Sequence, residues 1–243
     1  LAVGETPLLT GVEGIFVVAP TGLAGSLAGT IDLGGVLPAG VTVSGTFRLE
    51  TNQTTARVTE SVVLAGTTVS LDVPAGPYLK VAGTDVVVTI AGQSLRGDVA
   101  FERTGTATRL TFAHVTLRLG DGTTDLVVLS NGTGDILLGG TAAARTMSGS
   151  LSVDVAVLVP GVSLTGTVSL EVERTASLQR VRVGGTGLSL VVAGQSLGGD
   201  FWFEQSVSGT ARTVRVSASN VSVFLGDAGD PADAGDDRGV RLT

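Results

Sequence analysis

Cysteine is absent from this chain of 243 residues, which excludes disulfide bridges and thiolate metal sites. Histidine, methionine, tryptophan and tyrosine occur once each, and aromatic residues make up only 4%. Charged residues are scarce at 15%, against roughly a quarter in ordinary globular domains. The few titratable side chains are scattered and form no nucleophile–base pair, so we expect no enzymatic activity.

Excess positive charge and long apolar runs are also missing. The formal net charge is −7, which disfavours a nucleic-acid partner because phosphate binding needs a basic surface. Mean hydropathy is +0.45. Even so, Gly, Thr and Ser interrupt every apolar stretch before it reaches the roughly 18 residues of a membrane-spanning helix. We therefore expect no transmembrane segment.

The chain does contain a long internal repeat. Residues 81–102 read VAGTDVVVTIAGQSLRGDVAFE, and residues 183–204 read VGGTGLSLVVAGQSLGGDFWFE. An earlier pair matches as well, VTVSGTFRLE at 41–50 and VSLTGTVSLE at 162–171. Self-similarity over such a distance indicates one supersecondary unit copied in tandem.

Three short phrases of the form apolar–x–apolar–Gly mark the repeat boundaries. They divide the chain into the end of a preceding repeat at 1–4, a first unit at 5–120, a second unit at 121–226, and an acidic linker with the start of a further repeat at 227–243. Both ends of the chain fall inside the pattern, as expected for a segment of a longer array whose ends pair with neighbouring repeats or like subunits.

The offset between the copies falls from 121 residues, Val41 to Val162, to 102 residues, Gly92 to Gly194. The second unit therefore lacks 19 residues, which come roughly from 57–80 of the first. That length supplies two strands of about eight residues with their turns. Removing two antiparallel strands leaves the direction of all later strands unchanged. We therefore predict that the first unit has one hairpin more than the second.

The periodic segments read as half-buried antiparallel strands. Val41, Val43, Phe47 and Leu49 alternate with polar residues, and such a period of two is typical of a strand with one buried face. Valine and threonine dominate these segments, and both fit a pleated surface. No segment shows helical periodicity. The sequence predicts an all-β fold of tandem antiparallel meander strands with almost no helix.

Glycine recurs inside these strands, where it usually marks a bend, a bulge or a close backbone approach. The positions are Gly29, Gly45, Gly66, Gly83, Gly97, Gly149, Gly166, Gly185 and Gly199. Their recurrence suggests a shared bend line along which the sheet folds over its apolar face. The predicted shape is a meander rolled into an elongated β-sandwich or a solenoid-like rod.

Four loops carry glutamate where one strand ends and arginine where the next begins, which predicts cross-strand ion pairs. They span Glu50–Arg57, Glu102–Arg109, Glu173–Arg180 and Glu204–Arg212.

An acidic run, GDAGDPADAGDD, lies near the C-terminal end. Its carboxylates are Asp227, Asp230, Asp233, Asp236 and Asp237. Calcium prefers several carboxylate and carbonyl oxygens on flexible backbone, so this run is a candidate Ca²⁺ site. Its spacing does not match an EF-hand loop, and a solvated acidic linker is the alternative interpretation.

Trp202 is the candidate ligand- or partner-binding residue. It falls on the outward phase of its strand, where an aromatic ring can stack on a sugar or on a neighbouring chain. Packing under a loop is the alternative. His114 is expected at a surface strand position. Arg96-Gly97-Asp98 is an RGD triplet, the sequence that integrins bind in exposed loops, but we interpret it as a strand bend because the sister copy reads Gly198-Gly199-Asp200.

Three phrases, VPAGPYLKVAGTDVVVTIAGQSLRGDVAFE, NGTGDILL and GLAGSLAGTIDL, carry a resemblance that covers nearly the whole chain. They resemble tandem-repeat modules of giant surface or secreted proteins of environmental bacteria. The resemblance implies an extracellular or cell-surface repeat module and implies no activity. The 19 residues missing from the second copy depart from strict periodicity.

Three functions remain open from the sequence. The first is a structural segment of a bacterial surface fibre, stalk or filament, in which strand edges pair with neighbouring repeats. The second is an adhesin repeat that binds carbohydrate or a surface, with Ca²⁺ at the acidic run. The third is a β-groove that carries lipid on an open apolar face.

Overall fold

A computed structural model shows a chain built of β-strands. The structure describes residues 2–3, 6–7, 9–33, 37, 41–64, 66–90, 93–120, 124–140, 145–227 and 238–243, and no helix occurs among them. The first strands are β1 (Ala2–Val3), β2 (Thr6–Pro7), β3 (Leu9–Ala19), β4 (Gly22–Asp32), β5 (Val41–Asn52), β6 (Val58–Leu64), β7 (Thr67–Val73), β8 (Tyr78–Ile90) and β9 (Gln93–Thr104). The later strands are β10 (Ala107–Gly120), β11 (Asp125–Gly140), β12 (Arg145–Val159), β13 (Val162–Arg174), β14 (Leu178–Val192), β15 (Gln195–Ser208), β16 (Ala211–Asp227) and β17 (Arg238–Leu242).

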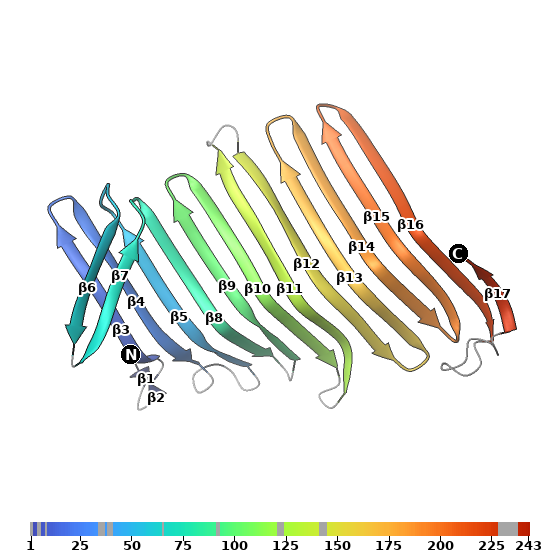
Figure 1. Cartoon of the computed structure of the whole chain (residues 1–243), viewed down its shortest axis with the longest axis horizontal. Helices are drawn as coiled ribbons and strands as arrows, with labels where there is room; N and C mark the ends of the chain where they lie inside the picture. The colour runs from blue at the N-terminus through green and yellow to red at the C-terminus, as the bar shows by residue number, and fades with distance from the viewer. Residues whose placement is uncertain are drawn as a thin grey trace. The chain divides into compact units, whose positions relative to one another are not determined.

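The strands form an antiparallel meander, which confirms the predicted all-β fold (Figure 1). Among the described residues the main sheet has the order β17-β16-β15-β14-β13-β12-β11-β10-β9-β8-β5-β4-β3, with β1–β2 and β6–β7 as separate pairs. The chain divides into two compact structural units, whose bounds differ from those of the sequence repeats. Unit 1 consists of Leu1–His114 and Asp135–Arg145, and unit 2 consists of Val115–Gly134 and Thr146–Thr243. The sandwich or rod shape stays a prediction.

The described residues include no helix that is long and apolar enough to span a membrane.

A separate hairpin accounts for the difference in length between the two copies. In unit 1, strands β6 and β7 pair with each other, while β5 pairs directly with β8. In unit 2, β13 pairs with β14 across a short loop. The hairpin therefore occupies the stretch from which the second copy has lost residues, and the sheet continues past it undisturbed. Figure 1 shows β6 and β7 lying across the first strands of the sheet.

Asn52 holds the base of this hairpin. The residue is fully buried, and its Nδ2 donates to the carbonyl oxygens of Ala56 at 2.8 Å and Pro74 at 2.7 Å. Its Oδ1 accepts from the backbone N–H and the hydroxyl of Thr54, both at 2.8 Å. A buried amide is stable only when its donors and acceptors are paired, and here all of them are.

The hairpin covers one face of the sheet in unit 1. Leu71 and Val73 of β7 are 1% and 0% exposed and pack in one cluster with Ile15, Ala24 and Tyr78. Burial raises the pKa of the Tyr78 hydroxyl, helped by the negative charges of Glu102 and Glu50. This cluster lies on the face that Asn52 shares, because residues directly opposite one another point to the same side.

The sheet of unit 2 has one apolar and one polar face. Three rungs across β12 to β16, each two residues from the next along the strand, define the apolar face: Gly149, Val172, Val181, Gln205 and Val214; Leu151, Leu170, Val183, Phe203 and Val216; Val153, Val168, Gly185, Phe201 and Ala218. The alternate rungs define the polar face: Ser150, Glu171, Arg182, Glu204 and Arg215; Ser152, Ser169, Gly184, Trp202 and Ser217. This alternation follows from the strand period of two.

Bulges cross the strands where interior glycines had predicted bends. The pairing register shifts between Gly83 and Val86 on β8 and between Gly185 and Leu188 on β14. The second of the two residues inside each shift has a left-handed backbone, with φ of 51° at Asp85 and 57° at Gly187. Register shifts on β5 and β13 surround Gly45 and Gly166, in agreement with the prediction. The prediction was wrong for Gly66, which lies in the turn between β6 and β7, and for Gly149, where the pairing register with β13 continues without a shift. At Gly29 the register continues without a shift toward β5 and shifts only toward β3.

We expect Asn52→Ala to release the hairpin without unfolding the sheet. The substitution leaves the buried Thr54 N–H and the Pro74 carbonyl without their partner and removes one of the two donors to the Ala56 carbonyl, at a cost of about 2 kcal/mol or more. Hydrogen exchange followed by mass spectrometry should then show faster exchange across β6 and β7 and unchanged exchange across β13 to β15. Thr55→Ala, an exposed neighbour, is the control. Equal exchange in both variants would contradict this role of Asn52.

Candidate functional site

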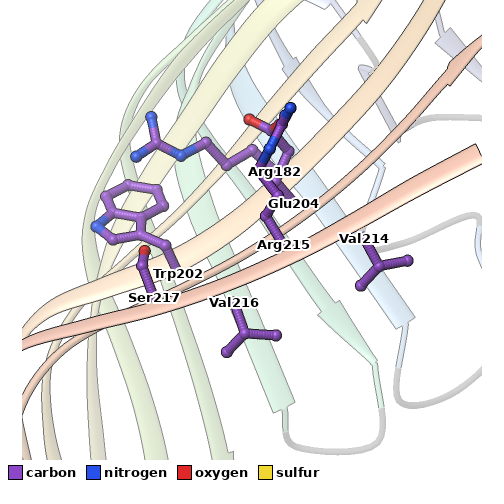
Figure 2. A pocket seen from close by; sticks show the side chains of 7 residues that line it. All are labelled: Arg182, Trp202, Glu204, Val214, Arg215, Val216 and Ser217. Carbon is purple, nitrogen blue, oxygen red and sulfur yellow. The ribbon is translucent and has the colours of Figure 1, made fainter.

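Trp202 lies on the polar face of unit 2, on the outward side that its sequence phase predicted. Its indole occupies the space above Gly184, directly opposite on β14, and a Cβ at Gly184 would overlap the ring. The guanidinium carbon of Arg182 lies 4.0 Å from the ring centroid, as Figure 2 illustrates. The side chain is half-buried. The missing side chain of Gly184 therefore provides the seat for the ring, and the arginine covers one of its faces.

Charged residues surround this ring. Arg215 Nη1 donates to Glu204 Oε1 at 2.6 Å across β15 and β16. The side chains border an open depression of about 540 Å³. Figure 2 shows Val214 and Val216 on the opposite side of β16 from Arg215 and Ser217. The depression is therefore open to solvent along β16 and is not a closed cavity.

This geometry limits what Trp202 can offer a sugar. Stacking needs a free aromatic face, and Arg182 already occupies one while the six-membered ring rests on Gly184. A ligand would have to displace the guanidinium or contact the ring edge. The binding role of Trp202 stays a prediction.

The candidate calcium site lies mostly outside the described residues. Asp227 ends β16 opposite Arg238 and is exposed. Asp230, Asp233, Asp236 and Asp237 fall in the stretch that the structure leaves undescribed. Within the described ranges, no group of three or more His, Asp or Glu side chains is placed to hold a metal ion. Calcium binding by the acidic run also stays a prediction.

Asp98 was predicted only as part of a strand bend, but in the structure it connects three strands. Asp98 follows Gly97 on β9, and its carboxylate contacts both neighbouring strands. Oδ1 accepts the backbone N–H of Asp85 on β8 at 2.8 Å, and Oδ2 lies 2.7 Å from Nδ1 of His114 on β10. Asp85 and His114 both have left-handed backbones, with φ of 51° and 54°. One carboxylate therefore connects the left-handed residues of the two neighbouring strands, an arrangement we name the aspartate clasp.

The same clasp recurs at the equivalent place in unit 2. Asp200 follows Gly199 on β15, and its Oδ1 accepts the backbone N–H of Gly187 on β14 at 2.8 Å. Its Oδ2 accepts from Nδ2 of Asn220 on β16 at 2.6 Å. Gly187 and Asn220 have φ of 57° and 52°. A histidine in one copy and an asparagine in the other thus serve as the second donor.

A related aspartate lies on β12. Asp154 Oδ2 accepts from Nδ2 of Asn131, whose φ is 54°, at 2.8 Å. Its Oδ1 accepts from the hydroxyl of Thr167 on β13 at 2.6 Å. These donors hold the pKa of Asp154 below its usual range, Thr167 first and Asn131 second. The side chain of His114 likewise lowers the pKa of Asp98, and the Gly187 N–H that of Asp200.

The clasp also explains the RGD triplet. Arg96 Nη2 donates to Asp85 Oδ1 at 2.7 Å, and Asp98 makes the bonds described above. Both charged residues of the triplet therefore have partners within unit 1, in agreement with the strand-bend interpretation. The signal that identifies the clasp in the sequence is the Gly-Asp pair shared by both copies. His114, at an exposed strand position as predicted, shares no residue type with Asn220 and gives no such signal.

The predicted Glu–Arg pairs are correct in one loop of four. Arg180 and Glu173 lie 2.8 Å apart. Glu204 instead pairs with Arg215, because Arg215 is the residue directly opposite it, whereas Arg212 is opposite Val207. The remaining two arginines also bond elsewhere: Arg57 to Asp72 within the hairpin and Arg109 to Asp135 on β11.

Comparison with known proteins gives no match to a protein-family model, to a curated protein or to a solved structure.

We expect Arg182→Ala to expose Trp202, the single tryptophan of the chain. Removing the guanidinium opens one ring face to water, so the emission maximum should shift to longer wavelength and quenching by acrylamide should increase. The cation–π contact contributes roughly 0.5–1 kcal/mol at an exposed site, so the fold should survive. Arg180→Ala on the same face of β14 is the control. Equal quenching in the two variants would contradict the stacking.

Acidification should remove the stabilisation that the aspartate clasps provide. The folded pKa of Asp200 lies below the unfolded value of 3.8. Its contribution is therefore present above about pH 4 and is lost as the pH falls through the lowered folded pKa. We expect the urea midpoint of Asp200→Asn to lie below that of the native chain near neutral pH, and the gap to close in acid. Asp227→Asn is the control, and a gap that does not change with pH would refute the assignment.

Proposed function

We propose that this chain is a structural repeat segment of an extracellular bacterial surface fibre, stalk or filament. The observation that carries the proposal is the recurrence of the aspartate clasp. Asp98 and Asp200 occupy equivalent positions and make the same pair of bonds, so ionisable side chains at these positions hold strands together. A repeated architectural device supports a mechanical role, and it gives no support to a catalytic one.

Open strand edges support assembly with neighbouring repeats or like subunits. Among the described residues, β3 ends the sheet order on one side. On the other side, β17 pairs with β16 from Val223 to Asp227, and no other described strand pairs with 211–222 on that edge. Unpaired backbone N–H and C=O groups at such an edge accept a further strand. In a fibre these edges extend the sheet from one segment to the next.

The pairing between β10 and β11 indicates what kind of strand fits the open edge of β16. Gly132 of β11 lies so close to Val115 of β10 that a Cβ would press on the valine. Val221 follows the left-handed Asn220 on β16 as Val115 follows His114. A strand that joins β16 in the same way therefore needs glycine beside Val221. The corresponding residue on β3, after left-handed Gly11, is Val12, so β3 is less suited to this place than a strand like β11.

Fibre diffraction and electron microscopy of the purified chain and of native material test the proposal. Within the described ranges each copy contributes six strands to the main sheet, the first copy through β3, β4, β5, β8, β9 and β10. At about 4.8 Å per strand, a fibre that grows in the hydrogen-bonding direction should repeat every 29 Å or so along its axis. Millimolar Ca²⁺ should stiffen the fibre if the acidic run binds it. Discrete particles under all conditions would count against a filament.

A lipid-carrying β-groove is the second candidate function. The observation that favours it is the exposure of the apolar face of unit 2, where Phe203 is 45% and Val216 is 76% exposed. Mass spectrometry of lipids extracted from the natively purified chain tests it. Co-purified acyl lipid at a fixed stoichiometry would support a groove, and its absence would leave the structural role.

A further inference from the structure

We propose that the apolar face of unit 2 is a contact surface for the same face of a second copy of this chain. The three rungs that define it contain no charged residue, and Gln205 is their single polar side chain. The proposal concerns a sheet face, whereas the proposed fibre depends on sheet edges. The two can therefore be tested separately.

The exposure of this face is the first argument for an interface. Val181, Val183, Phe203 and Val214 are 41–52% exposed, and Val216 is 76% exposed. They adjoin one another on β14, β15 and β16, so together they form one continuous patch. Contiguous apolar patches of this kind mark interaction sites, whereas isolated exposed apolar residues do not.

The size of the face is the second argument. The apolar face continues past the bulge through a further rung of Val157, Leu164, Leu190, Leu197 and Val223. Five strands about 4.8 Å apart, each with about twelve residues at roughly 3.3 Å, therefore cover on the order of 24 Å by 40 Å, or about 950 Å². A specific protein–protein interface buries about 800 Å² on each partner. The apolar face therefore matches the area that a stable dimer needs, and one further sheet is enough to cover it.

The distribution of charge is the third argument and favours a second copy. Arg174 and Arg212 lie on this face at strand ends, and Arg212 Nη2 donates to Oε1 of Gln205 at 2.6 Å, so these polar side chains border the apolar centre. An apolar centre with a polar rim is the usual anatomy of an interface. Two copies related by a two-fold axis present this surface to each other without burying a charge. Stacked sheets approach to about 10 Å, and half-exposed valine and phenylalanine side chains fill that space.

Phe203 is the best position for a test because β15 is paired on both sides, so its substitution leaves the strand edges intact. Sedimentation velocity of the full chain over a concentration series should show a monomer–dimer equilibrium. We expect Phe203→Lys to weaken the dimer by at least about tenfold. Ser206→Lys, on the polar face of the same strand, should leave it unchanged. Trp202 fluorescence verifies that both variants fold.

Single-cysteine variants give a second readout that does not depend on a charged substitution. The native chain has no cysteine, so Phe203→Cys and Ser206→Cys each carry one thiol. With rising protein concentration, maleimide labelling should slow for Phe203→Cys and stay constant for Ser206→Cys. Equal labelling at both positions, or a monomer at every concentration, would overturn the proposal. A monomer that binds a fluorescent fatty acid, and loses it in Phe203→Lys, would also overturn it and assign the face to lipid.

Discussion

The position of the bulges is the constraint on which the two-faced sheet depends. A strand alternates its side chains with a period of two, so one inserted residue moves every later side chain to the other face. On β14 the apolar face is supplied by Val181 and Val183 before the bulge and by Leu188 and Leu190 after it. The aspartate clasp bonds the left-handed residue inside the bulge, and this fixes where the phase changes.

The clasp also shows how far the sequence specifies the structure. The all-β meander follows from alternation and from Val and Thr content, and the extra hairpin follows from the changed offset. The bulges were predicted at interior glycines, but the stronger signal is the phase change, from odd to even apolar positions on β14 and from even to odd on β16. The partner choices of Glu204 and Arg109 could not be predicted, because they depend on a register that the turns and bulges set together.

The candidate site was predictable only in part. The outward phase of Trp202 is visible in the sequence, since its neighbours on the strand are apolar. Its seat above Gly184 requires knowing that Gly184 lies directly opposite, which depends on the bulge at Gly187. The stacking of Arg182 then follows, because that residue is two positions from Gly184 on the same face. A long-range pairing thus converts an exposed aromatic residue into one that is half-covered by its own sheet.

The two copies differ in how they use the face that the hairpin covers, and few substitutions account for this. The cross-strand pair Asn52 and Tyr78 of unit 1 corresponds to Glu173 and Arg180 of unit 2. The first pair is buried and anchors the hairpin, and the second is a solvent-facing ion pair worth little to stability. A hairpin over Glu173 and Arg180 would have to bury both charges, which is costly. The loss of the hairpin and the gain of charge are therefore coupled, and neither change alters the apolar side of the sheet.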